Sequence, residues 1–275
     1  MTPMIRIDDL EDSRLDAFRE LRDADLRGAR SLFTVESERV LRRFLESGWP
    51  AESVLLEEDV HTRLEEVIDT LNPSIPVYVT ANGSLDEVSG YGFHRGALAL
   101  GRRAPDRPAH LRLEGPRTQP ISTLLAADGV AHVDNMGSLF RNAACLGATG
   151  ILLGPGCADP LFRKTVRISS GHVFKVPWEQ TEDLHGTLSD LKARHGFHII
   201  GLELSVESRN IESMTSASRT VLIVGSEGDG LSPATRTLCD EIVHIPGADG
   251  ANQDSLNVAV ASAIGLHELG RRARG

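Results

Sequence analysis

Lysine, cysteine and long apolar runs are all scarce in this chain of 275 residues. The 3 cysteines are odd in number and widely spaced, which fits neither a disulfide framework nor a paired zinc-ligand spacing. No run of about 18 apolar residues occurs, and the N-terminus lacks the basic patch and apolar stretch of a secretory signal. The 10 histidines are also scattered. We therefore expect a cytoplasmic protein with no metal and no membrane partner.

The charge balance restricts the partners of the protein. The chain carries 39 acidic and 29 basic side chains, which gives a formal charge of −10 at pH 7. This balance argues against nonspecific coating of nucleic acid, because neutralising phosphates requires an excess of Lys and Arg. A local basic surface remains possible. Nearly all the basic residues are arginines, whose planar guanidinium group suits bidentate contacts with phosphate.

Signals for strands and helices alternate along most of the chain. In the N-terminal part they predict helices at 9–27, 36–47 and 61–71 and strands at 32–35, 53–56 and 77–79, in a small α/β unit that closes near 97–100. In the C-terminal part they predict strands at 122–126, 150–153, 198–201, 220–224 and 242–245, with helices at 137–146, 161–168, 184–195, 233–239 and 255–269. This alternation favours an α/β fold with a mostly parallel sheet covered by helices on both faces.

A segment rich in proline and arginine separates the two parts. It begins near Gly101, and its prolines and charged side chains make burial unfavourable. We predict a first domain at 1–103, a linker at 104–118 and a second domain at 119–275.

Three polar motifs follow predicted strands of the second domain. They read D-N-M-G-S-L-F-R-N-A at 134–143, I-V-G-S-E-G-D-G-L-S at 223–232, and I-P at 245–246 with D-S-L-N-V at 254–258. Together they supply acidic groups, polar side chains and glycine-rich backbone, as a nucleotide-type cofactor site requires. The second motif is not a P-loop, because no lysine follows Gly230, and not a nucleophile elbow, because Val224 stands where the first glycine is required.

Each motif alone has a structural explanation as well. Asn135 and Ser255 could cap helices, and Gly225–Gly230 could be a plain tight turn. Arg141 lies on an otherwise apolar helix, so we expect it to be partly buried and to need a carboxylate or phosphate partner. Asn257 is unfavourable in the middle of a helical turn, which indicates a task for its side chain.

In this order, the motifs resemble those of the SpoU (TrmH-like) branch of the SPOUT RNA methyltransferases. The family pattern N-x-G-x-x-x-R-x-A is matched by Asn135, Gly137, Arg141 and Ala143. The pattern G-x-E-x-x-G-[LMI] is matched by Gly225, Glu227, Gly230 and Leu231, and I-P…S-L-N-V by Ile245, Pro246 and Ser255–Val258. The residues before Asn135 depart from the usual Asp-Pro, and the loop Gly247–Asp254 is about two residues longer than is usual in the family.

The N-terminal part resembles the substrate-binding domain of the same family, which is similar to small ribosomal RNA-binding proteins. The segment F-T-V-E-S-E-R-V-L at 33–41 resembles the family's E-G-x-x-x-L, with Ser37 in place of the more common glycine. The segment S-G-Y-G-F-H-R-G-A-L-A-L at 89–100 resembles the closing signature of that domain. This match is weaker than the match of the three motifs.

The resemblance implies a catalytic domain with a deep trefoil knot, assembled as a homodimer, that transfers a methyl group from S-adenosylmethionine to a ribose 2′-hydroxyl in RNA. By the same resemblance, Arg141 engages an RNA phosphate and is a candidate to accept the hydroxyl proton. Asn135, Ser255 and Asn257 would orient Arg141 and the ribose, and Glu227 would fix Asn135 or its own loop. Backbone around three residues would hold the cofactor: Gly225, Ile245 and Leu256.

Further RNA contacts are predicted from spacing alone. Arg163, Lys164 and Arg167 share one face of a predicted helix and are candidates to bind phosphate; the alternative is a solvated helix face. The N-terminal recognition domain favours ribosomal RNA over transfer RNA. Three other functions stay open, namely a noncatalytic RNA-binding or ribosome-assembly protein, a tRNA ribose methyltransferase and an enzyme that methylates a base nitrogen.

Overall fold

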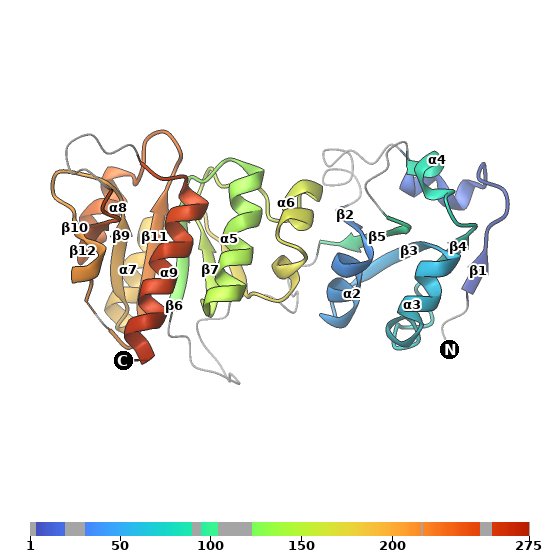
Figure 1. The fold of residues 1–275 in the computed structure, drawn as a ribbon, viewed down its shortest axis with the longest axis horizontal. Helices are drawn as coiled ribbons and strands as arrows, with labels where there is room; N and C mark the ends of the chain where they lie inside the picture. Colours follow the sequence, from blue (N-terminus) through green and yellow to red (C-terminus); the bar gives the residue numbers. More distant parts are fainter. Residues whose placement is uncertain are drawn as a thin grey trace. The chain divides into compact units, whose positions relative to one another are not determined.

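A computed structural model of the chain describes residues 4–19, 31–89, 95–103, 123–215, 217–247 and 255–274. They form two compact units (Figure 1). The first contains 1–108 together with 160–175, and the second contains 109–159 and 176–275. The assignment of 160–175 to the first unit differs from the predicted division of the chain. The predicted linker, 104–118, lies outside the described residues.

The first unit is built on a five-stranded mixed sheet with the strand order β1-β4-β3-β5-β2. Strand β4 is parallel to β1 and β3, whereas β5 is antiparallel to β3 and β2. The strands are β1 (Met4–Arg6), β2 (Leu32–Glu36), β3 (Ala51–Glu57), β4 (Val77–Thr80) and β5 (Ala97–Arg102). The helical elements are η1 (Ser13–Phe18), α2 (Glu38–Glu46), α3 (Glu58–Ile68) and α4 (Leu85–Ser89), joined by α6 (Arg163–Ile168) and η2 (His172–Phe174).

Apolar side chains from η1 and the sheet form one core of the first unit. Leu15 and Phe18 of η1 are fully buried with Leu55 of β3 and Leu98 of β5. The amphipathic helix predicted over 9–27 is therefore only partly right: the described part of this range forms the short 3₁₀ helix η1, and 20–30 lie outside the described residues. Its apolar positions nevertheless face the core as predicted.

The second unit contains a seven-stranded sheet with the order β10-β12-β9-β11-β6-β7-β8. All the strand pairs described in it are parallel, which confirms the predicted α/β class. Strand β11 lies between β6 and β9 and pairs with both. The strands are β6 (Thr123–Asp128), β7 (Gly150–Leu153), β8 (Trp178–Gln180), β9 (His198–Leu202), β10 (Arg209–Asn210), β11 (Thr220–Gly225) and β12 (Glu241–His244).

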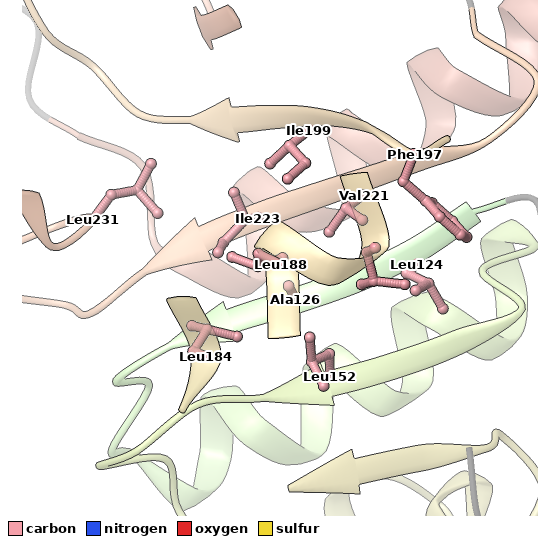
Figure 2. Packing of buried hydrophobic residues seen from close by; sticks show 11 residues of the cluster. Leu124, Ala126, Leu152, Leu184, Leu188, Phe197, Ile199, Val221, Ile223 and Leu231 are labelled. Carbon is pink, nitrogen blue, oxygen red and sulfur yellow. The ribbon is translucent and has the colours of Figure 1, made fainter. Parts of the chain in front are cut away.

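Helices cover both faces of this sheet (Figure 1). On one face, Leu184 and Leu188 of α7 (Leu184–His195) pack on alternate strand residues such as Ile223, as Figure 2 shows. On the other face, α5 (Val133–Leu146) lies beside α9 (Val258–Arg274). A Cβ atom on Gly265 of α9 would lie 2.8 Å from Leu222, the strand residue that points away from α7. A short 3₁₀ helix, η3 (Ile211–Ser213), and the helix α8 (Pro233–Leu238) complete the unit.

The predicted elements of the second unit are confirmed, although some of their ends are not. Helix α5 begins at Val133, four residues before the predicted start, and ends at Gly147 in a left-handed conformation with φ 85°. Helix α9 begins at Val258, three residues after the predicted start. The strands β1, β8 and β10 were not predicted, because they have only two or three residues each and show no alternation. Among the described helices, none is long and apolar enough to cross a membrane.

Candidate functional site

The three motifs meet at the carboxyl edge of the parallel sheet. Strand β6 ends at Asp128, β11 ends at Gly225 and β12 ends at His244, and each is followed by one of the motifs. Because parallel strands end at the same edge, their following loops converge there. The same edge binds ligands in open α/β sheets generally.

Hydrogen bonds join one polar side chain from each motif. Asn135 Nδ2 donates to Glu227 Oε1 at 2.7 Å, and Asn257 Nδ2 donates to Asn135 Oδ1 at 3.0 Å. The backbone N–H of His132 also points to Glu227 Oε1, at 3.4 Å. Asn135 thus connects the loop after β11 to the start of α9, positions that lie 92 and 122 residues from it in the sequence.

Glu227 is held as an anion at this site. Partial burial acts to raise the pKa of Glu227, but the Asn135 amide and the backbone N–H groups of Glu227 and His132 act to lower it. The nearby His132 side chain lowers it further, and the pKa lies below its usual value. The Glu227 carboxylate thus accepts from the side-chain amide of Asn135 and the backbone amide of His132. Among the described residues it has no cationic hydrogen-bond partner. This arrangement leaves negative charge at the edge of the sheet.

Asn257 has two tasks, one of which the sequence analysis assigned to another residue. Its Oδ1 accepts from the backbone N–H of Ala259 at 2.9 Å, and its carbonyl oxygen accepts from Ala261 N at 2.9 Å. Asn257 is therefore the N-cap of α9, and the prediction of a mid-turn asparagine was wrong. Ser255, predicted as the cap, lies three residues before α9 and is exposed.

Asn135 and Arg141 also differ from their predicted settings. Asn135 lies inside the first turn of α5 and does not cap it. Arg141 follows about 1.7 turns later on the same helix, and it is exposed where partial burial was expected. In the part of the chain that the structure describes, the Arg141 guanidinium group has no hydrogen-bond or ion-pair partner. Its side chain is thus available to an external anion.

The glycine-rich loop after β11 is a tight hairpin. Ser226 and Gly230 exchange backbone hydrogen bonds, and Gly230 has a φ of 69°. A Cβ atom on Gly225 would lie 2.1 Å from the carbonyl carbon of Gly230. The close approach that requires glycine at 225 is therefore within the loop itself, whereas the glycine-rich backbone was predicted to serve a cofactor.

Two acidic residues that the sequence analysis missed hold this loop. Glu203 Oε1 accepts from Leu231 N at 3.0 Å, and Asp128 Oδ2 accepts from Ser232 N at 2.9 Å. Asp128 is the last residue of β6 and Glu203 follows the last residue of β9. An acidic residue at the end of an apolar strand is the signal that could have identified both.

The predicted cofactor residues lie at the same edge of the sheet. Gly225 is buried at the end of β11, and Ile245 is half-buried directly after β12. Leu256 is 48% exposed near the start of α9. Most of the loop between β12 and α9, 248–254, lies outside the described residues. No group of three or more potential metal ligands is present among the residues that the structure describes.

The predicted RNA contacts on α6 lie in the first unit, where Arg163 and Arg167 contact Glu36. Arg163 Nε donates to Glu36 Oε2 at 2.6 Å, and an Arg167 nitrogen donates to Glu36 Oε1 at 3.1 Å. The Glu36 side chain is fully buried, and that of Arg163 is 15% exposed, so a solvated helix face does not describe Arg163. Lys164 is exposed on the same helix. The role of the three residues in RNA binding stays a prediction.

A family model and two sequence relatives match the part of the chain that contains this site. The model of the SpoU rRNA Methylase family matches residues 122–267, which include all three motifs. An uncharacterized tRNA/rRNA methyltransferase of Mycobacterium bovis is 34% identical over 271 residues, covering 96% of this chain and 90% of the relative. A 23S rRNA (guanosine-2′-O-)-methyltransferase, RlmB, of Acinetobacter baylyi is 28% identical, covering 89% of this chain and 94% of the relative.

Solved structures agree in fold. An rRNA methyltransferase from Sinorhizobium meliloti superposes with a TM-score of 0.80 over 98% of each chain, at 22% identity. The SpoU methyltransferase AviRb from Streptomyces viridochromogenes, in complex with AdoMet, superposes with a TM-score of 0.77 at 24% identity, over 96% of this chain and 99% of that chain. Family match, sequence relatives and motif geometry agree, and the chain belongs to the SpoU rRNA methylase family of RNA methyltransferases.

Proposed function

We propose that this protein methylates a ribose 2′-hydroxyl in structured ribosomal RNA, with S-adenosylmethionine as methyl donor. The observation that carries the proposal is the hydrogen-bonded chain Glu227–Asn135–Asn257, which joins the three motifs at one edge of the sheet. The names of the relatives support an RNA substrate, and the RlmB relative supports ribose as the methylated group.

The residues at this edge fit S-adenosylmethionine, which carries a sulfonium cation, hydroxyl and ammonium donors and an apolar ring. Glu227 supplies an anion, and Glu203 Oε2 is a buried oxygen with no hydrogen-bond partner among the described residues. Leu256 offers exposed apolar surface. Glu227, Glu203 and the backbone at Gly225, Ile245 and Leu256 would hold the cofactor, which when bound supplies an electrophilic methyl carbon.

The side chains of the site then have separate tasks. Arg141 binds an RNA phosphate and places the ribose oxygen, because its guanidinium group is exposed and unpaired in the described structure. Alignment of the reacting atoms supplies several kcal/mol of the barrier. Asn135, Ser255 and Asn257 orient Arg141 and the ribose, and Glu227 fixes Asn135. A guanidinium group keeps its proton in ordinary surroundings, so Arg141 serves as a positioning group more readily than as a base.

The proposal includes a trefoil knot, a recognition domain and a homodimer. The knot rests on the family resemblance, in which the C-terminal part passes through a loop. The first unit would recognise RNA through 1–103, as small ribosomal RNA-binding proteins do. Leu256, two residues before α9, and Val260, in its first turn, are each 48% exposed. They supply apolar surface beside the site for a second copy of the chain.

The test is methyl transfer by the full chain. Purified protein is incubated with labelled S-adenosylmethionine and either ribosomal RNA or transfer RNA, and the product is digested with alkali. A 2′-O-methyl group leaves one alkali-resistant linkage at the modified nucleotide, which sequencing then locates. Label on a base, without an alkali-resistant linkage, would show that the methylated group is a base nitrogen and not the ribose. Failure to bind the cofactor in calorimetry would support a noncatalytic RNA-binding protein.

A further inference from the structure

A second polar contact joins α5 to α9 and has no role in the function described above. Asn142 Nδ2 donates to the carbonyl oxygen of Ala259 at 2.7 Å and to Ser262 Oγ at 3.0 Å. Ser262 Oγ in turn donates to Ala259 O at 2.8 Å, so the three groups close a triangle. Ser262 is fully buried and Asn142 is half-buried between the two helices.

The surroundings of this triangle are small and apolar. Ala259 of α9 is buried at this contact and Ala143, next to Asn142 in α5, is also buried; such small side chains allow one helix to slide or rotate against the other. The half-buried Asn142 amide prevents this, because its hydrogen bonds form at only one register and losing them would leave polar groups unpaired. Single buried asparagines set helix register in this way in coiled coils. The triangle therefore specifies one arrangement of α5 on α9.

That arrangement controls the exposed arginine next to Asn142. Arg141 has no partner of its own in the described structure, so among the described residues only the α5 backbone limits where its guanidinium group can reach. The start of α9 carries Asn257, which holds Asn135. We propose that Asn142 is a positioning residue for methyl transfer, which fixes α5 on α9 so that Arg141 stands at the place of reaction.

The proposal rests on the proposed function, and three variants test it. Asn142→Leu keeps the approximate volume and removes both hydrogen bonds. Ser262→Ala is milder, because it leaves the bond to the Ala259 carbonyl oxygen. Ile199→Val is the matched control, since the Ile199 side chain is fully buried in the core on the α7 face of the same sheet, opposite to the face that α5 and α9 cover. For each variant, kcat, the Kd of S-adenosylmethionine and the Tm are measured.

We expect Asn142→Leu to lower kcat roughly tenfold to a hundredfold, because a displacement of about 1 Å at a reacting group has an effect of that size. The Kd of the cofactor should stay within about twofold of the wild-type value, and Ser262→Ala should lower kcat less. Ile199→Val should lower the Tm and leave kcat unchanged. A wild-type kcat in Asn142→Leu would overturn the positioning role alone. An inactive wild-type protein would overturn the proposed function and this role together.

Discussion

Two carboxylates, Glu36 in the first unit and Glu227 in the second, differ in the charge of their partners. Glu36 in the first unit is fully buried and contacts two arginines, so its charge is satisfied within the unit. Glu227 in the second unit is exposed and bound by neutral amide donors, which stabilise the anion without cancelling its charge. The first arrangement is closed to ligands, whereas the second leaves charge for one. A carboxylate available to a ligand thus differs from a structural one in having neutral partners instead of cationic ones.

The units also differ in backbone strain. All four non-glycine residues with positive φ in the described chain belong to the first unit: Ser31, Ser37, Arg95 and Ser170. In the second unit the described residues with positive φ are glycines, such as Gly230. Ser37 has φ 75° and ψ 144°, a region that glycine prefers, and it stands where the resembling family has glycine. The first unit thus tolerates strain that the second avoids.

The largest effect is expected from replacing Arg141, the exposed cation of the second unit that has no partner among the described residues. Arg141→Ala should lower kcat for methyl transfer by about 10²–10⁴-fold, because the ribose is no longer placed by a cation. Cofactor binding should remain nearly intact in calorimetry, since no cofactor group depends on Arg141. Arg141→Lys, which keeps the charge, serves as control. Full activity in Arg141→Ala would remove the residue from the mechanism.

Breaking the closed ion pair of the first unit comes next. Glu36→Gln removes the charge of a fully buried carboxylate that pairs with Arg163 and Arg167, and should lower the free energy of unfolding by about 3 kcal/mol. Glu38→Gln removes a surface carboxylate paired with Arg63 and should cost less than about 1 kcal/mol. Urea denaturation measures both. Equal effects would contradict the distinction between a closed and an open carboxylate.

Removing the charge of the open carboxylate should act on binding instead of folding. Glu227→Gln keeps an acceptor for Asn135, and we expect the Kd of S-adenosylmethionine to rise about tenfold, or roughly 1.4 kcal/mol. The control is Asp229→Asn in the same exposed loop, which should change the Kd less than about twofold. Because the pKa of Glu227 is depressed, its charge is lost only below its usual range. Wild-type affinity should therefore hold from about pH 7 to pH 5.

The smallest effect concerns backbone strain. Ser37→Gly should stabilise the protein by about 1 kcal/mol, since relief of strain exceeds the greater freedom of glycine in the unfolded chain. Gly230→Ala is the opposite case, because a Cβ atom there would lie 2.1 Å from Glu203 Oε1 at a φ of 69°. Thermal melting of the two variants should give Tm shifts of opposite sign. A lower Tm for Ser37→Gly would show that the conformation at Ser37 is not strained.

Prediction from sequence succeeded where local signals were strong. The central strands of the second unit are continuous apolar runs, which is why β6, β9 and β11 were predicted within one or two residues. The order of the motifs identified the residues that meet at the sheet edge. Helix starts were less predictable: Asn257 caps α9 in a position fixed partly by its bond to Asn135, 122 residues away. No local pattern contains that information.

The largest difference between sequence and structure concerns 160–175. Its residues follow β7 in the chain, and the predicted division therefore placed them in the second domain. In the structure they belong to the first unit. The ring centroids of Phe174 and Phe44 lie 5.1 Å apart, and Arg163 pairs with Glu36, 127 residues away. Spacing on α6 showed that Arg163 and Arg167 share a face. It could not show that a buried carboxylate meets that face.

The sequence by itself determined the α/β class, the longer strands and the residues of the three motifs, because apolar runs and glycine-rich turns act over a few residues. Only the tertiary structure decided the partner of each charge: two arginines for Glu36, the Asn135 amide for Glu227, and none for Arg141 among the described residues. The reason is physical. Electrostatic and hydrogen-bonding partners are chosen by distance in space, and the burial that sets their strength exists only after the chain has folded.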